Sequence, residues 1–426
     1  MKKVLFLFLI LSILVTPLFA KGSQEAKGPL VLTYWTHEDP NRTKIEERYI
    51  KEFEAANPNI KIERTTQSSS KIIELVQTAF AANSGPDIFD LSNADNYVYI
   101  ANHRVAPVNA QAMGYASQQA LEETFLDGIL DSVKLDGKIY ALMYEFGNYA
   151  IMVNKKVFRS AGLDPEKDYP RTWEDMVEVS KKLVLRDGEI LTRRGFDFRY
   201  AHLLTSMMPM IIQLGGEIKS SSGEYFAGEE AWLTWLRFLQ QWGPNGMNLG
   251  SPTYKAPRSL FNSDNNDIAM CMTGLYQAAR MEEENPSFYD SKEWMYIPNP
   301  VFKNAVQDVS CFHYGQYYLV NAQSSAEKQE AAWKFIGYMM SHGEEYLSEA
   351  ALLQPTKKLL ESDQYKNIPY SDVFANEIAR SRASYTGANS GELQILIRTA
   401  MESVMLSGVT PEKAYATLKA AAKELD

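Results

Sequence analysis

Strand-like and helix-like segments alternate regularly between residues 30 and 91, and this alternation constrains the fold more than any other feature. Residues 30–35 form a short apolar run typical of a buried strand, and residues 60–63 alternate apolar and charged side chains. An amphipathic helix is predicted between them, and a second helix leads to a third strand at residues 87–91. This β-α-β-α-β order predicts a parallel sheet with right-handed crossovers, and therefore an α/β fold.

Segments of the same two kinds recur through the rest of the chain. Residues 139–143 and 149–153 are strand-like, and Thr172 is expected to cap a helix that carries Trp173. Residues 410–412 have the Thr-Pro-Glu pattern of a helix start. Because the 426 residues contain more such segments than one sheet needs, we expect two lobes.

Polar and aromatic side chains follow each of the first three predicted strands, in residues 35–38, 66–68 and 92–95. In open parallel sheets, ligands bind outside the carboxyl ends of the strands, so these segments are candidates for a binding site. Neither GxGxxG nor GxxxxGK[ST] occurs in the chain. The usual phosphate-binding loops of nucleotide sites are therefore excluded.

The charge and the metal-binding residue types exclude other classes. The net charge of −10 argues against a general nucleic-acid-binding role. The two cysteines, Cys271 and Cys311, form no CxxC motif, and we expect separate burial as free thiols in preference to a bridge. The five histidines are scattered without HxH or HExxH, so no metal site and no cofactor are predicted.

The N-terminus has the layout of a secretory signal peptide. Lys2 and Lys3 precede an apolar run over residues 4–15, and Ala20 stands at the expected cleavage edge. The run is short for a membrane span, although an uncleaved anchor is the alternative reading. We expect a signal peptide over residues 1–20, a flexible spacer over 21–29 and no lipid anchor, because no cysteine follows the apolar run.

Short motifs then follow in a fixed order from residue 30 to the C-terminus. They are Tyr34-Trp35, Ser84-Gly85-Pro86-Asp87-Ile88, Asp136-Gly137-Lys138-Ile139-Tyr140-Ala141-Leu142, Val153-Asn154-Lys155-Lys156-Val157-Phe158, Ala161-Gly162-Leu163, Thr172-Trp173-Glu174-Asp175, Ala269-Met270 with Gly274-Leu275-Tyr276, and Ala331-Ala332-Trp333-Lys334-Phe335-Ile336. In this order they resemble family 1 extracellular solute-binding proteins, the sugar-type receptors of ABC importers, distantly similar to maltose-binding protein. Met143 and Tyr276 depart from the Pro and Trp that are common in that family.

The resemblance implies an α/β, two-lobed clamshell. Each lobe would be a mostly parallel sheet flanked by helices, and hinge strands would join the lobes around a ligand cleft. By family comparison, one lobe takes residues 30–146 and 312–355, and the other takes residues 147–311 and 356–426. The protein implied is a monomeric, non-enzymatic receptor of the periplasm, which delivers a sugar or oligosaccharide to the membrane permease subunits of an ABC transporter.

A sugar presents an apolar ring face and a rim of hydroxyls, which suit an aromatic plate surrounded by amides and carboxylates. The binding positions of the family match Trp35, Asn93, Asp95, Glu145 and Tyr276. The full set of expected ligand-binding residues is Trp35, His37, Glu38, Asn93, Asp95, Glu145, Tyr149, Tyr276, Gln277, Tyr314 and Gln354. Packing in the core is the alternative for Trp35 and for Tyr276. The alternative is an ion pair at the hinge for Glu145, and solvent exposure or helix capping for Asp95.

Two other functions stay open on the sequence alone. An exported carbohydrate-active enzyme is possible in principle, because a carboxylate pair can always be proposed among 53 acidic residues. No nucleophile elbow, zinc motif or cofactor fingerprint supports it. The other alternative is a receptor for a phosphorylated polyol or a polyamine.

Overall fold

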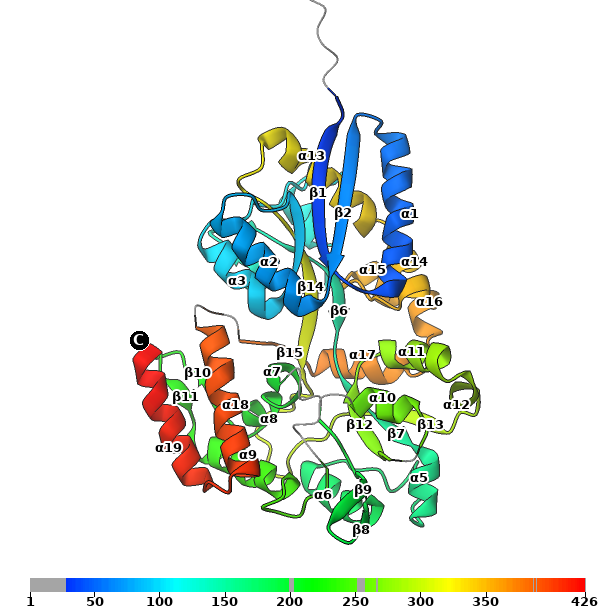
Figure 1. Cartoon of the computed structure of the whole chain (residues 1–426), viewed down its shortest axis with the longest axis vertical. Coiled ribbons are helices and arrows are strands. Elements are labelled where there is room, and N and C mark those ends of the chain that lie inside the picture. The colour runs from blue at the N-terminus through cyan, green and yellow to red at the C-terminus, as the bar shows by residue number, and fades with distance from the viewer. Residues whose placement is uncertain are drawn as a thin grey trace, which may run out of the picture.

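The computed structural model describes residues 28–198, 203–250, 257–265, 267–385, 387 and 389–425. The chain forms two lobes, one above the other in Figure 1, with β6 and β14 running between them. The predicted signal peptide and nearly all of the spacer lie outside the described residues. Among the helices that are described, none combines the length and the apolar character needed to cross a membrane.

The first lobe is built on a six-stranded sheet with the order β15-β14-β3-β1-β2, in which β6 pairs with β14. Its strands are β1 (Leu30–His37), β2 (Ile60–Gln67), β3 (Ile88–Ser92), β6 (Leu142–Gly147), β14 (Phe312–Val320) and β15 (Arg382–Ala383). β1 is parallel to β2 and β3, which confirms the order predicted from residues 30–91. β14 is antiparallel to β3 and to β6, so the complete sheet is mixed.

Helices cover this sheet on both faces, and the amphipathic pattern explains their packing. They are α1 (Pro40–Ala56), α2 (Ser69–Ala81), α3 (Asn93–Ala101), α4 (Gln118–Glu122), η1 (Asp131–Val133), α13 (Ala326–Met340), α14 (Gly343–Ala350), α15 (Lys357–Glu361) and α16 (Asp363–Lys366), with a small hairpin of β4 (Lys134–Leu135) and β5 (Lys138–Ile139). Ile45, Tyr49 and Phe53 of α1 are all buried in the core of this lobe. The predicted apolar stripe is therefore the buried face of the helix.

The second lobe has a three-stranded sheet with the order β12-β7-β13. Its strands are β7 (Ala150–Asn154), β12 (Met270–Thr273) and β13 (Trp294–Ile297). Both neighbours run antiparallel to β7, so the expectation of a mostly parallel sheet in each lobe is wrong for this lobe. All residues of the three strands are buried, and a continuous apolar run predicts burial on both faces but does not fix strand direction.

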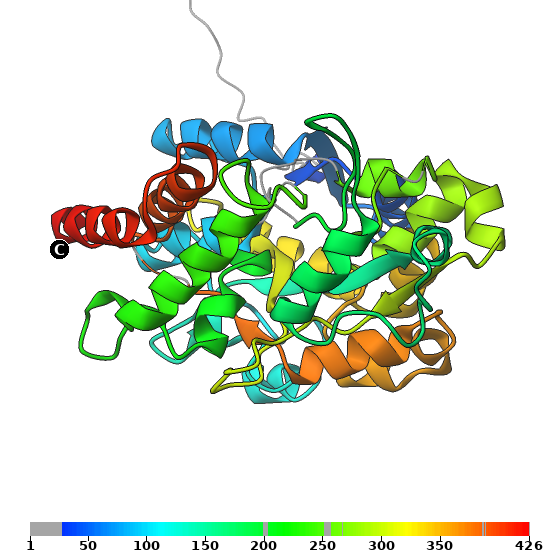
Figure 2. The same cartoon turned by 90° about the horizontal axis from the view of Figure 1, so that it is seen from below.

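The helices of the second lobe form a broad layer around this small sheet, and Figure 2 places α19 and α12 at opposite ends of it. They are α5 (Lys155–Ser160), α6 (Trp173–Leu183), α7 (Leu203–Ser206), α8 (Pro209–Gln213), α9 (Glu229–Trp242), α10 (Pro257–Asn262), α11 (Tyr276–Glu284), α12 (Pro286–Asp290), α17 (Ser371–Ala379), α18 (Ser390–Leu406), α19 (Pro411–Ala422) and η3 (Lys423–Leu425), with hairpins of β8 (Leu185–Asp187) and β9 (Ile190–Arg193) and of β10 (Glu217–Lys219) and β11 (Tyr225–Ala227). The predicted caps are confirmed: Thr172 accepts a hydrogen bond from the backbone N of Asp175, and Thr410 accepts one from that of Lys413.

Two strands connect the lobes directly. β6 ends at Gly147, and β7 begins in the second lobe at Ala150. β14 belongs to both lobes, because Phe312 packs in a core of the second lobe and Tyr317 packs in the core of the first. Residues 356–365 were expected in the second lobe, but Leu359 and Tyr365 pack in the core of the first. The other expected lobe boundaries remain predictions.

Both cysteines are buried, and they are not bonded to each other. Cys271 lies in β12, and Cys311 directly precedes β14. Burial raises the pKa of the Cys311 thiol to about 12. Its Sγ accepts a hydrogen bond of 3.4 Å from the backbone N of Tyr149, so the thiol contributes to the packing of the crossover between the lobes.

Candidate ligand-binding site

A cavity of about 280 Å³ lies between the two lobes. Each lobe and the hinge strands contribute to its wall, which consists of His37, Glu38, Asp39, Glu145, Tyr149, Arg258, Tyr276, Ala279, Arg280, Tyr314, Gln316, Ala350, Ala351 and Leu352. The first strand of the sheet ends at this cavity, as expected for an open α/β sheet. The second lobe reaches it through α10 and α11.

A buried carboxylate, that of Asp90, organises the end of β1 beside the cavity. Its Oδ2 accepts hydrogen bonds from Thr36 Oγ1 at 2.7 Å and Tyr144 OH at 2.6 Å. His37 Nδ1 lies 2.7 Å and Arg42 Nη1 lies 3.0 Å from the same oxygen. Burial alone would raise the pKa of Asp90, but His37 and Arg42 hold it well below its usual range. The carboxylate is therefore ionised and fixes the orientation of the His37 ring.

Behind Asp90, the charge network continues into the first lobe. Glu46 is fully buried, and its Oε1 lies 3.6 Å from Nε of Arg42. The second oxygen of Glu46 pairs with Nε of Arg64 at 2.9 Å. Tyr34 and Tyr318 each donate a hydrogen bond of 3.1 Å to Glu46. The charges of two acids and two arginines thus compensate one another, although Nε of Arg42 makes no hydrogen bond.

β14 and the turn between β6 and β7 supply two tyrosines beside the cavity. The rings of Tyr149 and Tyr314 lie with their centroids 5.0 Å apart. Gly147 and Gly274 allow this packing, because a Cβ atom at either position would collide with the Tyr314 ring or its hydroxyl. Glu145, on β6, faces the same cavity, and burial raises the pKa of its carboxyl. The wall therefore combines apolar ring faces with a carboxyl group that retains its proton more readily than an exposed one.

The second lobe contributes an aromatic ring flanked by positive charge. Arg258 Cζ lies 5.3 Å and Arg280 Cζ lies 4.9 Å from the centroid of the Tyr276 ring. Arg280 also reaches across the cleft, because its Nη2 lies 3.6 Å from Oδ2 of Asp39 in the first lobe. This ion pair links the two lobes at the edge of the cavity.

The structure brings together many of the residues that the sequence predicted for the site. His37, Glu38, Glu145, Tyr149, Tyr276 and Tyr314 all line the cavity. They come from the end of β1, the two hinge strands, the start of β7 and the start of α11. Their role in binding remains a prediction.

Other predicted residues lie outside the wall of this cavity. Trp35 is partly buried against the core of the first lobe. Asn93 is buried and Asp95 accepts a hydrogen bond from Ser92 Oγ, both in the first turn of α3, which begins directly after β3. Gln277 is buried and donates to Asn262 Oδ1, which joins α11 to α10. Gln354 is buried beside Gly343.

Several residues of the wall were not predicted from the sequence. They are Asp39, Arg258, Ala279, Arg280, Gln316, Ala350, Ala351 and Leu352. One signal was available, because Arg280 follows Tyr276 by four positions on a helix and therefore lies on the same face. Arg258 and Gln316 carry no comparable signal in the sequence, since the tertiary fold alone brings them to the cavity.

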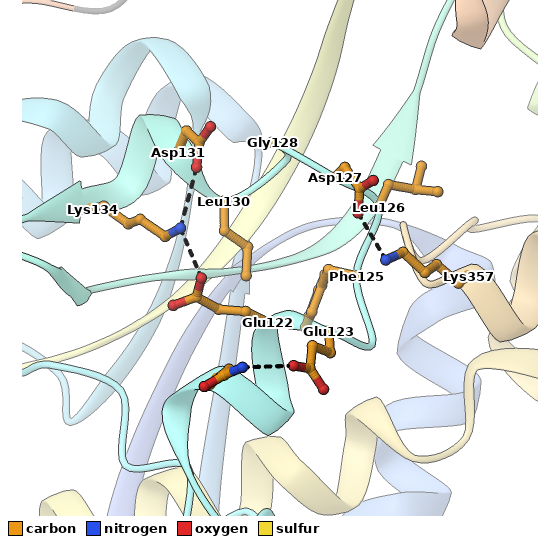
Figure 3. Close-up of a pocket in the computed structure, with 11 residues that line it drawn as sticks. Glu122, Glu123, Phe125, Leu126, Asp127, Gly128, Leu130, Asp131, Lys134 and Lys357 are labelled. Atoms are coloured by element: carbon orange, nitrogen blue, oxygen red, sulfur yellow. Dashed lines mark hydrogen bonds and ion pairs between the residues drawn. The ribbon is translucent and has the colours of Figure 1, made fainter.

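A second cavity, of about 340 Å³, lies wholly within the first lobe. Figure 3 shows that Glu122 and Asp131 point toward Lys134 and that Asp127 points toward Lys357. Lys134 pairs with Glu122 at 2.8 Å and with Asp131 at 3.2 Å, and Lys357 pairs with Asp127 at 2.7 Å. Because this cavity is lined by one lobe alone, the cavity whose wall comes from both lobes is the better candidate. In the part of the chain that the structure describes, no three acidic, histidine or cysteine side chains are grouped to hold a metal ion.

Known proteins share this architecture. A family model for the bacterial extracellular solute-binding protein matches residues 39–346. A protein of Brucella abortus (strain 2308), named only as a binding protein, is 22% identical over 396 residues, which are 88% of this chain and 87% of the relative.

Two solved structures are similar over nearly the whole chain. The maltose-bound MalE3 of T. maritima gives a TM-score of 0.77 at 19% identity, covering 93% of this chain and 100% of the other. UgpB of Mycobacterium tuberculosis in complex with glycerophosphocholine gives 0.76 at 15% identity, covering 93% and 98%. These likenesses bear on the fold, and they confirm the predicted periplasmic-binding-protein architecture.

The match to the family model spans most of the described chain, from the end of β1 to α14. This is the family of non-enzymatic solute-binding proteins that serve ABC transporters outside the cytoplasm. The chain belongs to the bacterial extracellular solute-binding protein family.

Proposed function

We propose that the chain is a periplasmic receptor that binds a sugar or oligosaccharide between its lobes and delivers it to the membrane permease subunits of an ABC transporter. The observation that carries the proposal is one cavity whose wall includes residues from both lobes and from both hinge strands. A solute held there contacts both lobes, so it stabilises the closed state relative to the open one.

The chemistry of the wall supports a hydroxyl-rich solute. Tyr314, which is partly buried, offers a ring for the apolar side of a sugar, and the buried ring of Tyr149 packs against it. His37, Glu145 and Gln316 offer donors and acceptors for its hydroxyls. The volume of about 280 Å³ is near the lower end of ligand pockets, which favours a small solute or one end of a longer one.

Mass spectrometry of the solute released when the purified protein is denatured tests this proposal. We expect one carbohydrate per chain, and the same carbohydrate should raise the melting temperature when it is added back without being converted to a product. A released peptide or metal ion, or conversion of an added sugar, would contradict the proposed function.

A further inference from the structure

The first crossover between the lobes leaves the strand ladders for two residues. β6 ends at Gly147 and β7 begins at Ala150, so Asn148 and Tyr149 belong to neither strand. Both residues are buried, at 4% and 1% exposure. Buried backbone groups without partners are costly, so these residues need hydrogen bonds from outside the ladders. Side chains provide them, as Sγ of Cys311 does for the backbone N of Tyr149.

Asn299 provides the partner of the Tyr149 carbonyl group, because its Nδ2 donates a hydrogen bond to that oxygen. Asn299 follows β13 and stands between Pro298 and Pro300. The ring of Pro298 fixes its own φ, and Pro300 disfavours a helical conformation for the residue before it. Asn299 is 2% exposed. The amide is therefore presented to the crossover from a stiff, buried segment.

The carboxyl group of Glu377, on α17, holds the Asn299 side chain. Its Oε2 accepts hydrogen bonds from the backbone N of Asn299 at 3.1 Å and from Nδ2 at 2.7 Å. An amide group has two N–H bonds, so Nδ2 serves both Glu377 and Tyr149. Glu377 is fully buried, and Arg380 pairs with its other oxygen. This pairing compensates the buried carboxyl group that orients Asn299.

The same end of α17 also contacts the second crossover, and Figure 1 shows this helix where β6 and β14 reach the second lobe. Ser310, just before β14, donates from Oγ to the backbone O of Glu377 at 2.9 Å. Its backbone N donates to the carbonyl of Arg380 at 3.1 Å. On the first crossover, Nδ2 of Asn148 donates to the carbonyl of Phe374 at 3.0 Å. Both crossovers are thus attached to α17 by buried hydrogen bonds.

This attachment determines where two tyrosine rings of the cavity lie. The Tyr149 ring starts from the backbone that Asn299 holds, and its centroid lies 5.0 Å from that of Tyr314. Tyr314 is partly buried and lines the cavity. A displacement of the Tyr149 backbone therefore moves the ring against which Tyr314 packs.

We propose that Asn299 is a positioning residue of the solute site, which holds the Tyr149 backbone and thereby the Tyr314 ring in the cavity wall. This inference rests on the proposed function and extends the site to a residue that does not line the cavity. Glu377 supports Asn299 in this role, and neither residue contacts the solute.

The deciding test observes the Tyr314 ring without any solute. 3-Fluorotyrosine is incorporated at position 314 of the purified chain, and its fluorine NMR signal is compared with that of the Asn299→Asp variant. This change places an oxygen against the Tyr149 carbonyl and against Glu377, so we expect the signal to shift or broaden while circular dichroism shows a folded chain. An unchanged signal would overturn the inference.

Asn154→Asp is the matched control. Asn154 is 1% exposed, lies in the same lobe, and its Nδ2 also donates to a carboxylate, that of Asp264 at 3.4 Å. This control should leave the signal at position 314 unchanged, and an equal change there would contradict a specific role of Asn299. Asn299→Ser removes the amide without adding a charge, and it gives the same test if Asn299→Asp does not fold.

A double-mutant cycle tests whether Asn299 acts on binding through Tyr149. In calorimetry with maltose and maltotriose, Asn299→Asp should weaken binding by roughly tenfold. In a chain that already carries Tyr149→Ala, the same change should weaken binding by less than about threefold, because the ring it positions is gone. Losses that multiply in the double variant would contradict this route. The fluorine signal decides the inference even where neither sugar binds.

The outcomes separate this inference from the proposed function. If the signal at position 314 changes as expected but the purified chain releases no carbohydrate, Asn299 positions the ring and the proposed function fails. If carbohydrate is released and the signal does not change, the receptor function stands and the positioning role is wrong.

Discussion

Nδ1 of His37 lies 2.7 Å from Oδ2 of Asp90, which ties a residue of the cavity wall to a fully buried carboxylate. Asp90 is 1% exposed and belongs to β3, whereas His37 is the last residue of β1. The contact between these adjacent parallel strands thus fixes the position of His37 in the cavity wall. Changes at Asp90 should therefore affect stability first and binding through the position of His37.

We expect Asp90→Asn to lower the free energy of unfolding by about 3–5 kcal/mol, because it leaves Arg42 buried without a full counter-charge. Asp95→Asn is the matched control, since burial raises the pKa of Asp95 and its charge is not stabilised by a cation in α3. Urea denaturation measures both. If the two variants lose the same free energy of unfolding, the ion pairs around Asp90 do not contribute more to stability than Asp95 does.

Acid should lower the free energy of unfolding by protonating Asp90. Its pKa in the folded state is lower than in the unfolded state, so the stabilisation is present above about pH 4 and is lost as the pH falls further. Urea titrations between pH 5 and pH 3 should show a decline in the free energy of unfolding that is shallower in Asp90→Asn. A parallel decline in both proteins would contradict this assignment.

A second pH effect should come from His313 at the hinge. Burial lowers the pKa of His313 to about 4, whereas an unfolded histidine titrates near 6.5. The unfolded chain therefore binds the proton first, and stability should fall by about 1–3 kcal/mol as the pH drops from about 6.5 to about 4. His313→Gln should remove this part of the pH dependence. The exposed His103, changed to Asn, serves as the control, and an identical flattening there would contradict the prediction.

Truncation of aromatic residues should separate binding from packing. Tyr276→Ala removes a ring from the cavity wall and should weaken solute binding by about thirtyfold or more. Trp35 lies outside the wall, and its ring packs partly against the core of the first lobe. Trp35→Ala should therefore lower the free energy of unfolding by about 2 kcal/mol. Calorimetry and thermal unfolding of both variants measure the two effects. Loss of binding in Trp35→Ala together with normal binding in Tyr276→Ala would show that the site lies at Trp35.

Gly147 permits the position of a tyrosine in the cavity wall. A Cβ at Gly147 would overlap the ring of Tyr314, so Gly147→Ala should displace this ring, weaken solute binding and lower the melting temperature. Gly391→Ala is the control, because nothing lies near the added methyl group at the start of α18. This change should be neutral or stabilise by up to about 1 kcal/mol. Normal binding in Gly147→Ala would show that the Tyr314 ring is dispensable.

Much of the fold could be predicted from local patterns. The spacing of Ile45, Tyr49 and Phe53 located α1, and Thr172 and Thr410 located two helix starts, because caps and amphipathic stripes are local properties. Strand direction in the second lobe was not predictable in this way. The pairing of β7 with β12 joins residues more than a hundred positions apart, and side-chain periodicity is the same for both directions.

The site could be predicted only in part, for the same reason. Residues at strand ends, such as His37 and Glu145, lie where the rule for open sheets places them. Asn93 and Asp95 follow a strand too, but they belong to the first turn of α3, which begins directly after β3, and they do not line the cavity. Arg258 reaches the cavity because α10 packs beside α11, which is a tertiary contact without a local signal.

A crystal structure of the chain with the solute identified by mass spectrometry tests the central claim most directly. The account predicts one solute molecule between the lobes, in contact with His37 or Glu145 on one side and with Tyr276 on the other. A solute bound to one lobe alone, for example in the cavity beside Lys134, would contradict it.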